Sequence, residues 1–359
     1  MKVLLRAALA IMVIVALVWG AAEYLLIRQA RQAEAQGRIT LGHAAMLADP
    51  ARIGGQFADV VIPQEWERRV TISDLAVWLP PLALNAPHVS LPAQITWGMP
   101  DDPRVAEFSG GQALARFSPL HGLALSGAEV ATAGARVDDH DVIGDTRITA
   151  TLTNFGAVIA PGVSAAYRVD IAISNLNLPA LAQMLEIGEA SGTHPGRAAI
   201  SGPVVVWLST LPGLRNPTRP EVMGVIFDGL RITVDGAEMR LWGQLARDEA
   251  GQMAGEMALD STQLRDFVTL LAHAGYMPVG FAPLTASALE TVAEATRKKE
   301  DAAPVNPSDL SELRRDAGNP HITPRPDGVD RIPLRIEGGL ITVGDLPLGA
   351  LLSRVAPAP

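Results

Sequence analysis

The stretch "RITVDGAEMRLWGQLARDEAGQMAGEMAL", residues Arg231 to Leu259, decides the fold class of this chain. Its apolar residues recur at every second position, which is typical of a β-strand with one buried face. Asp235-Gly236 interrupts the alternation and favours a two-residue type I′ hairpin, because both central residues of that turn need positive φ. A second turn in "RDEAGQ" returns the chain toward Leu259. The stretch therefore predicts three antiparallel strands that share one apolar face, made of Ile232, Val234, Met239, Leu241, Met257 and Leu259.

Short alternating runs recur through most of the chain, as in residues 68–97 and 145–179. The 33 Gly and 27 Pro are spread between these runs, and such punctuation is typical of short strands joined by turns. Helical spacing of apolar residues appears in three places, residues 177–190, 261–277 and 281–300. The pattern predicts a mainly β (α+β) fold, an elongated, curved antiparallel sheet with a few short helices on one face.

The N-terminal segment, residues 1–28, is predicted to be a transmembrane helix. Its apolar core reaches the roughly 20 residues that a span needs, and Lys2 and Arg6 favour a cytoplasmic N-terminus. The residues expected to face lipid or its interface are Ala7, Ile11, Ile14, Leu17, Trp19 and Tyr24. A cleaved signal peptide ending near residues 20–22 is the alternative. The anchor implies a single-pass protein of the bacterial inner membrane whose main domain lies in the periplasm.

The remaining chain divides by composition into four parts. Residues 29–37 are good helix formers and read as a stalk, and residues 38–300 form a β-rich periplasmic domain. Residues 301–330 are rich in Pro, Asp and Asn, which indicates a flexible linker or excursion. Residues 331–359 are predicted to form a final hairpin that rejoins the sheet.

Several kinds of chemistry find no support in the sequence. The net charge of −9 and the lack of a basic stripe argue against nucleic acid, and the absence of Cys removes disulfides and thiolate sites. An acidic cluster at residues 138–145 does not match a calcium loop and reads as a solvated turn between strands. The seven His show no paired ligand spacing, and there is no phosphate loop or dinucleotide motif. We therefore predict no catalytic residue, no metal and no cofactor.

Five of the six Trp lie in or near the predicted strands, at positions 66, 78, 97, 207 and 242. Packing in the core or over a sheet edge is the ordinary role of such residues. The sharper hypothesis is that some of them line a hydrophobic groove.

Several segments resemble a known family. They are the N-terminal anchor, "LADPARIGGQFADVVIP" (47–63), "LPPLALNAPHVSLPAQITW" (79–97), "MRLWGQLARDEAGQMAGEMAL" (239–259) and the terminal "GGLITVGDLPLGAL". Together they resemble the alphaproteobacterial envelope family called domain of unknown function 2125. A looser likeness is to AsmA-like envelope proteins, whose long curved sheets hold lipid acyl chains in a groove. The resemblance implies an envelope location and a β fold, and it implies no catalytic residue.

These observations favour a protein that is not an enzyme and that binds a lipid or another hydrophobic ligand in a β-sheet groove, in the biogenesis of the envelope. The physical reason is that three modest helices cover little of a long one-sided sheet, so a ligand or a partner is expected to cover the rest. A scaffold that binds another envelope protein is the alternative. A hydrolase with an unrecognised site is the third reading.

Overall fold

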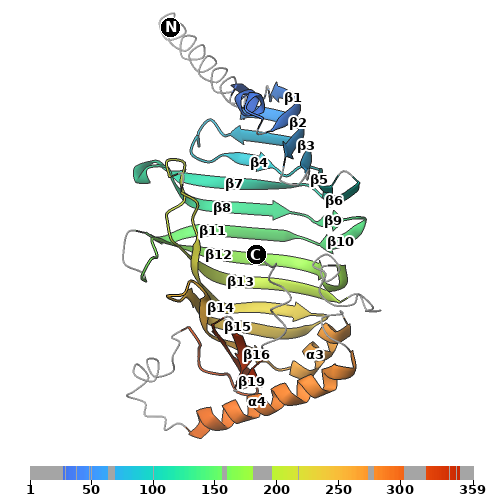
Figure 1. The fold of residues 1–359 in the computed structure, drawn as a ribbon, viewed down its shortest axis with the longest axis vertical. Helices are drawn as coiled ribbons and strands as arrows, with labels where there is room; N and C mark the ends of the chain where they lie inside the picture. Colours follow the sequence, from blue (N-terminus) through green and yellow to red (C-terminus); the bar gives the residue numbers. More distant parts are fainter. Residues whose placement is uncertain are drawn as a thin grey trace, which may run out of the picture. The chain divides into compact units, whose positions relative to one another are not determined.

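The computed structural model describes residues 27–347, except for residues 29, 38, 48, 50, 64–68, 100, 156–159, 181–195, 217, 274–278, 303–320, 339 and 345. The chain divides into two compact units, Met1–Asp141 and Val142–Pro359. This division falls inside the region 38–300 that the sequence analysis treats as one domain. Both units are built mainly from antiparallel strands, so the predicted β class is confirmed (Figure 1).

The predicted transmembrane helix falls almost entirely on residues 1–26, outside the described residues. Among the helices that the structure describes, none combines the length and the apolar character that crossing a bilayer requires.

The first unit starts with a meander of β1 (Thr40–Met46), β2 (Ile53–Pro63) and β3 (Arg69–Leu79). Strand β3 then has two partners on its other side. Its C-terminal end pairs with β4 (His88–Ser90), followed by β7 (Gly111–Ser118) and β8 (Ala124–Thr132). Its N-terminal end pairs with β5 (Gln94–Met99), followed by β6 (Asp102–Phe108) and β9 (Ala135–Val137). Prolines at 80, 81, 87 and 92 separate these pairings, because proline cannot donate a hydrogen bond to a sheet.

The second unit is a longer antiparallel series. After β10 (His140–Ile143) come β11 (Thr146–Phe155), β12 (Ala165–Asn177), β13 (Arg197–Leu208), β14 (Val222–Val234), β15 (Ala237–Arg247), β16 (Met253–Ser261), β17 (Asp330–Glu337), β18 (Leu340–Val343) and β19 (Leu346–Pro347). From β11 to β19 each strand pairs with the next. Strand β17 pairs with β16, so the last strands lie in the same sheet as the earlier ones.

The three strands predicted from Arg231 to Leu259 are confirmed as the end of β14, β15 and most of β16. The turn residues Asp235 and Gly236 have φ values of 44° and 93°, as a type I′ hairpin requires. Across the ladders Leu241 lies opposite Leu259, and Val234 opposite Ala237. Directly opposed residues lie on the same side of a sheet, so this register places all six predicted residues on one face.

Two of the three predicted helices are present within the described residues. Helix α3 (Leu264–His273) begins beside Ser261, whose hydroxyl accepts a hydrogen bond from the Gln263 N–H at 3.0 Å. After the short 3-10 helix η2 (Val279–Phe281), helix α4 (Ala282–Ala302) follows. Of the helix predicted at 177–190, residues 178–180 are helical, and 181–190 lie outside the described residues. The linker predicted at 301–330 is likewise only partly described.

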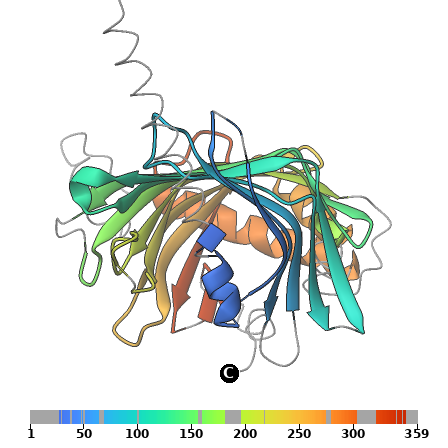
Figure 2. The same cartoon turned by 90° about the horizontal axis from the view of Figure 1, so that it is seen from above.

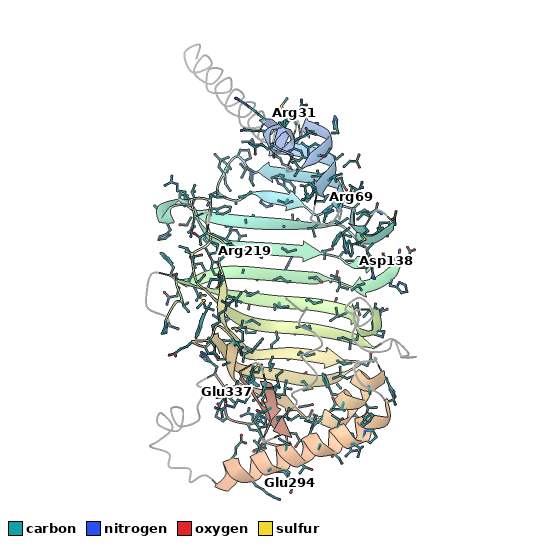
Figure 3. All side chains as sticks on the ribbon, in the orientation of Figure 1. Arg31, Arg69, Asp138, Arg219, Glu294 and Glu337 are labelled. Atoms are coloured by element: carbon teal, nitrogen blue, oxygen red, sulfur yellow. The ribbon has the colours of Figure 1, made fainter. Side chains whose placement is uncertain are left out.

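Helices α3 and α4 pack on one face of the second unit's sheet. Phe267 of α3 belongs to a cluster with Val234 and Met239, and Ala286 of α4 belongs to a second cluster with Ile332. In Figure 2 the strands of this unit arch with α4 beneath them, so the helices lie on the concave side. Glu294 points away from the sheet on the outer side of α4 (Figure 3).

Candidate functional site

The most distinctive surface of the second unit is the sheet face on which α3 and α4 pack, which we call the apolar face. It is defined by the register, because residues directly opposite one another share a side. Starting from Tyr167 of β12, the register adds Leu152 of β11 and Val206 of β13, then Val225 of β14 and Leu245 of β15. The six residues predicted from Arg231 to Leu259 lie on the same face.

The apolar face is almost free of charge. Along β11 to β17 the charged residues that the register places on it are Arg247 and Asp330, and both stand at strand ends. The opposite face carries Arg147, Arg168, Asp170, Arg231, Glu238, Arg240 and Glu256. Two faces that differ this much in polarity indicate that one of them is built to be kept from water.

One end of the apolar face is covered by the chain itself. Val234 is 1% exposed and Met239 5%, and both pack in the cluster that contains Phe267 of α3. Met257 is 8% exposed, and Leu259 packs against both helix-containing clusters. For Val234 and Met239 the prediction of a ligand-lining groove therefore needs correction: they are core residues, because α3 fills the space above them.

The other end of the face is not part of these clusters. We call it the outer segment and define it by nine half-buried residues: Ile148, Ala150, Leu152, Val169, Ile171, Val206, Val225, Phe227 and Leu245. Within the described residues, neither of the two core clusters includes any of them. The outer segment thus presents a continuous aliphatic surface with a single aromatic ring, that of Phe227, among its half-buried side chains.

Tyr167 lies in the middle of the outer segment, opposite Leu152 and Val206. It is 4% exposed. Burial raises the pKa of its phenol to about 12, because the phenolate is poorly solvated there. The shift indicates that this part of the face has a low polarity.

The two tryptophans of the second unit's described strands, Trp207 and Trp242, do not line the apolar face. Trp207 lies opposite Ala166 and Gly224, and Trp242 opposite Ala258, and these positions are on the other side of the sheet. A Cβ at Gly224 would lie 2.7 Å from Trp207, and one at Gly229 would lie 2.8 Å from Trp242. The hypothesis that tryptophans form the groove is therefore wrong for these two, because each ring covers a glycine on the opposite face.

A third tryptophan, Trp78 of the first unit, also lies opposite a glycine, Gly54, but a Cβ there would meet the Trp78 backbone and Cβ and not the ring. The ring instead stacks on His88 with centroids 5.4 Å apart, and the Arg52 guanidinium lies 5.0 Å from the ring centroid.

One buried ion pair stands out among the polar groups. Arg331 of β17 and Asp260 of β16 make two hydrogen bonds of 2.7 Å, and each side chain is 6% exposed. Arg331 Nη1 also donates to the Thr323 carbonyl at 2.6 Å, and the same nitrogen lies 3.9 Å from the Glu300 carboxylate of α4. The pair joins two strands, the 321–329 segment and α4, which is a structural role.

In the acidic cluster at residues 138–145, Asp138 (Figure 3) and Asp139 form a turn between β9 and β10, whereas His140 and Asp141 belong to β10 and Asp145 precedes β11. Asp138 contacts Arg104 at 3.6 Å and Asp141 contacts Arg136 at 3.2 Å. In the part of the chain that the structure describes, no three His, Cys, Asp or Glu residues gather as metal ligands would.

The chain matches one family over residues 28–351, described as an uncharacterized protein conserved in bacteria, DUF2125. Comparisons with curated proteins and with solved structures gave no match. The matched range covers most of both units and every residue of the apolar face. Because the match covers nearly the whole chain and agrees with the resemblance found in the sequence, the protein belongs to the DUF2125 family.

Proposed function

We propose that this protein binds lipid acyl chains on the outer segment of its apolar face, without catalysis, as a membrane-anchored periplasmic protein of the bacterial envelope. The observation that carries the proposal is the outer segment itself, a row of half-buried aliphatic side chains on five neighbouring strands with no charge among them. Water contact with such a surface is unfavourable by about 25 cal/mol per Å² of apolar area.

An acyl chain suits this surface better than a small polar ligand. Binding sites for polar metabolites combine apolar walls with a few convergent polar groups, whereas the outer segment contributes alkyl groups, one phenyl ring and the buried phenol of Tyr167. The concave side of a bent sheet also follows the length of an extended chain (Figure 2). The looser likeness to AsmA-like proteins supports the same proposal.

The test compares two valines that are neighbours on β13. Val206 lies opposite Tyr167 on the apolar face, and Val205 lies opposite Arg168 on the other face. Both are half-buried, so Val206→Asp and Val205→Asp place the same charge on opposite sides of one strand. The full chain is purified, its bound lipid is extracted and identified by mass spectrometry, and binding of a fluorescent fatty acid is titrated.

Wild-type protein and Val205→Asp are expected to carry lipid and to bind the probe. Val206→Asp is expected to bind at least about tenfold more weakly, because an unpaired buried carboxylate costs several kcal/mol. Thermal unfolding of both variants checks that they are equally folded. Wild-type protein without co-purified lipid or probe binding would overturn the proposal, and equal binding by the two variants would move the site away from the outer segment.

Two further experiments address the cellular part of the proposal. Protease accessibility in spheroplasts is expected to show both units outside the inner membrane. Crosslinking in cells separates lipid binding from the scaffold alternative, which predicts one protein partner and no specific lipid.

A further inference from the structure

Three leucines project from two turns at one end of the first unit. Leu82 is 102% exposed, Leu84 59% and Leu120 92%. The first two lie in the 80–87 turn between β3 and β4, and Leu120 lies in the 3-10 helix η1 (Pro119–His121) between β7 and β8. We call these three residues the apolar tip.

The two turns are held together by backbone geometry. Strands β3 and β7 both run antiparallel to β4, so their C-terminal ends, Leu79 and Ser118, lie at the same end of the unit. The Phe117 N–H donates to the Asn85 carbonyl at 2.8 Å, and the Asn85 side-chain amide donates to the Phe117 carbonyl at 2.8 Å. The apolar tip is therefore one site, although Leu120 follows Leu84 by 36 positions and Leu82 by 38 positions in the sequence.

Both turns are stiff. Prolines at 80, 81, 87 and 119 restrict the backbone, and the Ala83 and Ala86 N–H groups donate within the first turn at 2.9 Å. Leu82 and Leu120 are almost fully exposed and contribute no packing to the fold, and more than half of Leu84 is exposed beside them. Three exposed leucines on preformed turns, where polar residues are usual, indicate a surface outside the chain that receives them.

Two arginines, Arg52 and Arg116, border the tip, and Asp49 is paired with Arg52 at 3.4 Å. The nearest other acid, Glu129, lies further back on β8, opposite Leu114.

Acidic residues gather at the opposite end of the same unit, in a chain with a net charge of −9. Asp138 lies on the same side as Arg69, at the N-terminal end of β3, in Figure 3. Asp101, Asp139 and Asp141 stand at that end too. Asp138 and Asp141 are paired there with Arg104 and Arg136, so acidic side chains are in a small excess at this end, which we call the acidic end, whereas two arginines border the apolar tip.

We propose that the apolar tip inserts into the headgroup region of a bilayer that contains anionic lipid. Exposed apolar side chains on loop tips with basic neighbours are suited to that interface, since the alkyl groups leave water while the cations contact lipid phosphates. A protein partner would need about 800 Å² on each side for a stable contact, which three leucines on two narrow turns do not provide.

The experiment uses single-cysteine labelling, which is clean because the natural chain has no Cys. Leu82→Cys, Leu120→Cys and the control Met99→Cys are each labelled with the environment-sensitive dye NBD in the full chain. Met99 is 50% exposed and lies at the acidic end of the unit. The labelled proteins are reconstituted with vesicles of phosphatidylcholine and phosphatidylglycerol, with and without doxyl-labelled lipid.

The emission of the dye at positions 82 and 120 is expected to shift to the blue and to be quenched by doxyl lipid. Both effects are expected to be weaker in vesicles of phosphatidylcholine alone. Dye at position 99 is expected to keep the emission of a water-exposed probe. Emission at 82 and 120 equal to that at 99 would overturn the inference. So would a blue shift that doxyl lipid does not quench, because it would indicate a protein surface.

A second set of variants keeps the dye at one position of the tip and changes the other two leucines. With the dye at Leu84→Cys, the double change Leu82→Gln and Leu120→Gln is expected to abolish doxyl quenching, since each lost leucine weakens insertion roughly tenfold. The control Met99→Gln should leave quenching at position 84 unchanged. These readouts are independent of lipid binding on the outer segment, so either proposal can fail alone.

Discussion

The buried pair Asp260–Arg331 gives the sharpest test of how the second unit is held together. We consider the change Arg331→Met, which keeps most of the side-chain volume and removes the guanidinium. Asp260 would then hold a carboxylate that is 6% exposed and has lost both of its 2.7 Å partners. The Thr323 carbonyl would also lose its donor.

Removing one member of a buried ion pair costs about 3–5 kcal/mol, mostly because the other charge remains buried without a partner. For a domain of about 150–250 residues, 1 kcal/mol lowers the melting temperature by about 2–4 °C. Multiplying the two values gives an expected decrease of roughly 6–20 °C in the melting temperature of the second unit.

The assay is differential scanning calorimetry of the full chain, which resolves separate transitions if the two units unfold independently. Arg168→Met is the matched control, because Arg168 makes a pair with Asp170 of 3.1 Å whose side chains are 47% and 51% exposed. An exposed pair of this kind contributes about 1 kcal/mol or less. The double change Asp260→Leu with Arg331→Met is expected to recover most of the loss, since no buried charge then remains. If Arg331→Met lowered the melting temperature no more than Arg168→Met, the reasoning would be refuted.

Two further predictions concern the sheet of the second unit. Gly243→Ala is expected to lower the free energy of unfolding by at least about 2 kcal/mol, because φ is +118° there and a Cβ would lie 2.3 Å from the Glu256 carbonyl oxygen. Urea unfolding measures this loss. The control is Gly280→Ala, where nothing lies within 4 Å of the added Cβ, and it is expected to change the free energy of unfolding little. Tyr167 is expected to ionise near pH 12 when phenolate absorbance is followed. Because its folded pKa is raised above the ordinary value of about 10, its contribution to stability is complete below pH 10 and is lost between about pH 10 and 12. Tyr167→Phe should remove that late step, and an unchanged titration would contradict the assignment.

The strands were predictable where a period of two is combined with a turn signal. In Arg231 to Leu259 the Asp-Gly turn fixes the pairing, so the register and the shared face follow from the sequence. The branching of β3 toward β4 and β5 was not predictable, because it depends on which short strands meet along its length. The division of the chain after residue 141 also lacks a local signal, since no linker-like composition marks it.

The candidate site was predictable in its chemistry and less so in its position. Alternation identifies which side chains share a face, but it does not tell which part of that face a helix will cover. Val234 and Met239 carried the clearest signal because they flank the hairpin turn, and the same position places them directly under α3. The outer segment lies on β11 to β15, and a bulge between Asp228 and Leu230 of β14 shifts the alternation by one residue and hides the continuity of the face.

The tryptophans show a related limit and suggest a signal that could have been used. The rings of Trp207 and Trp242 each cover a glycine on the neighbouring strand, so a tryptophan beside a strand glycine indicates cover for that glycine and not a ligand site. Both rings lie on the side of the second unit that carries the arginines and carboxylates, away from the apolar face. The outer segment, which combines alkyl groups with the rings of Phe227 and Tyr167 and has no charge, offers dispersion and little hydrogen bonding. Selectivity among lipids on the outer segment should therefore depend on the length and unsaturation of the acyl chain, whereas the headgroup should matter at the apolar tip, where Arg52 and Arg116 lie.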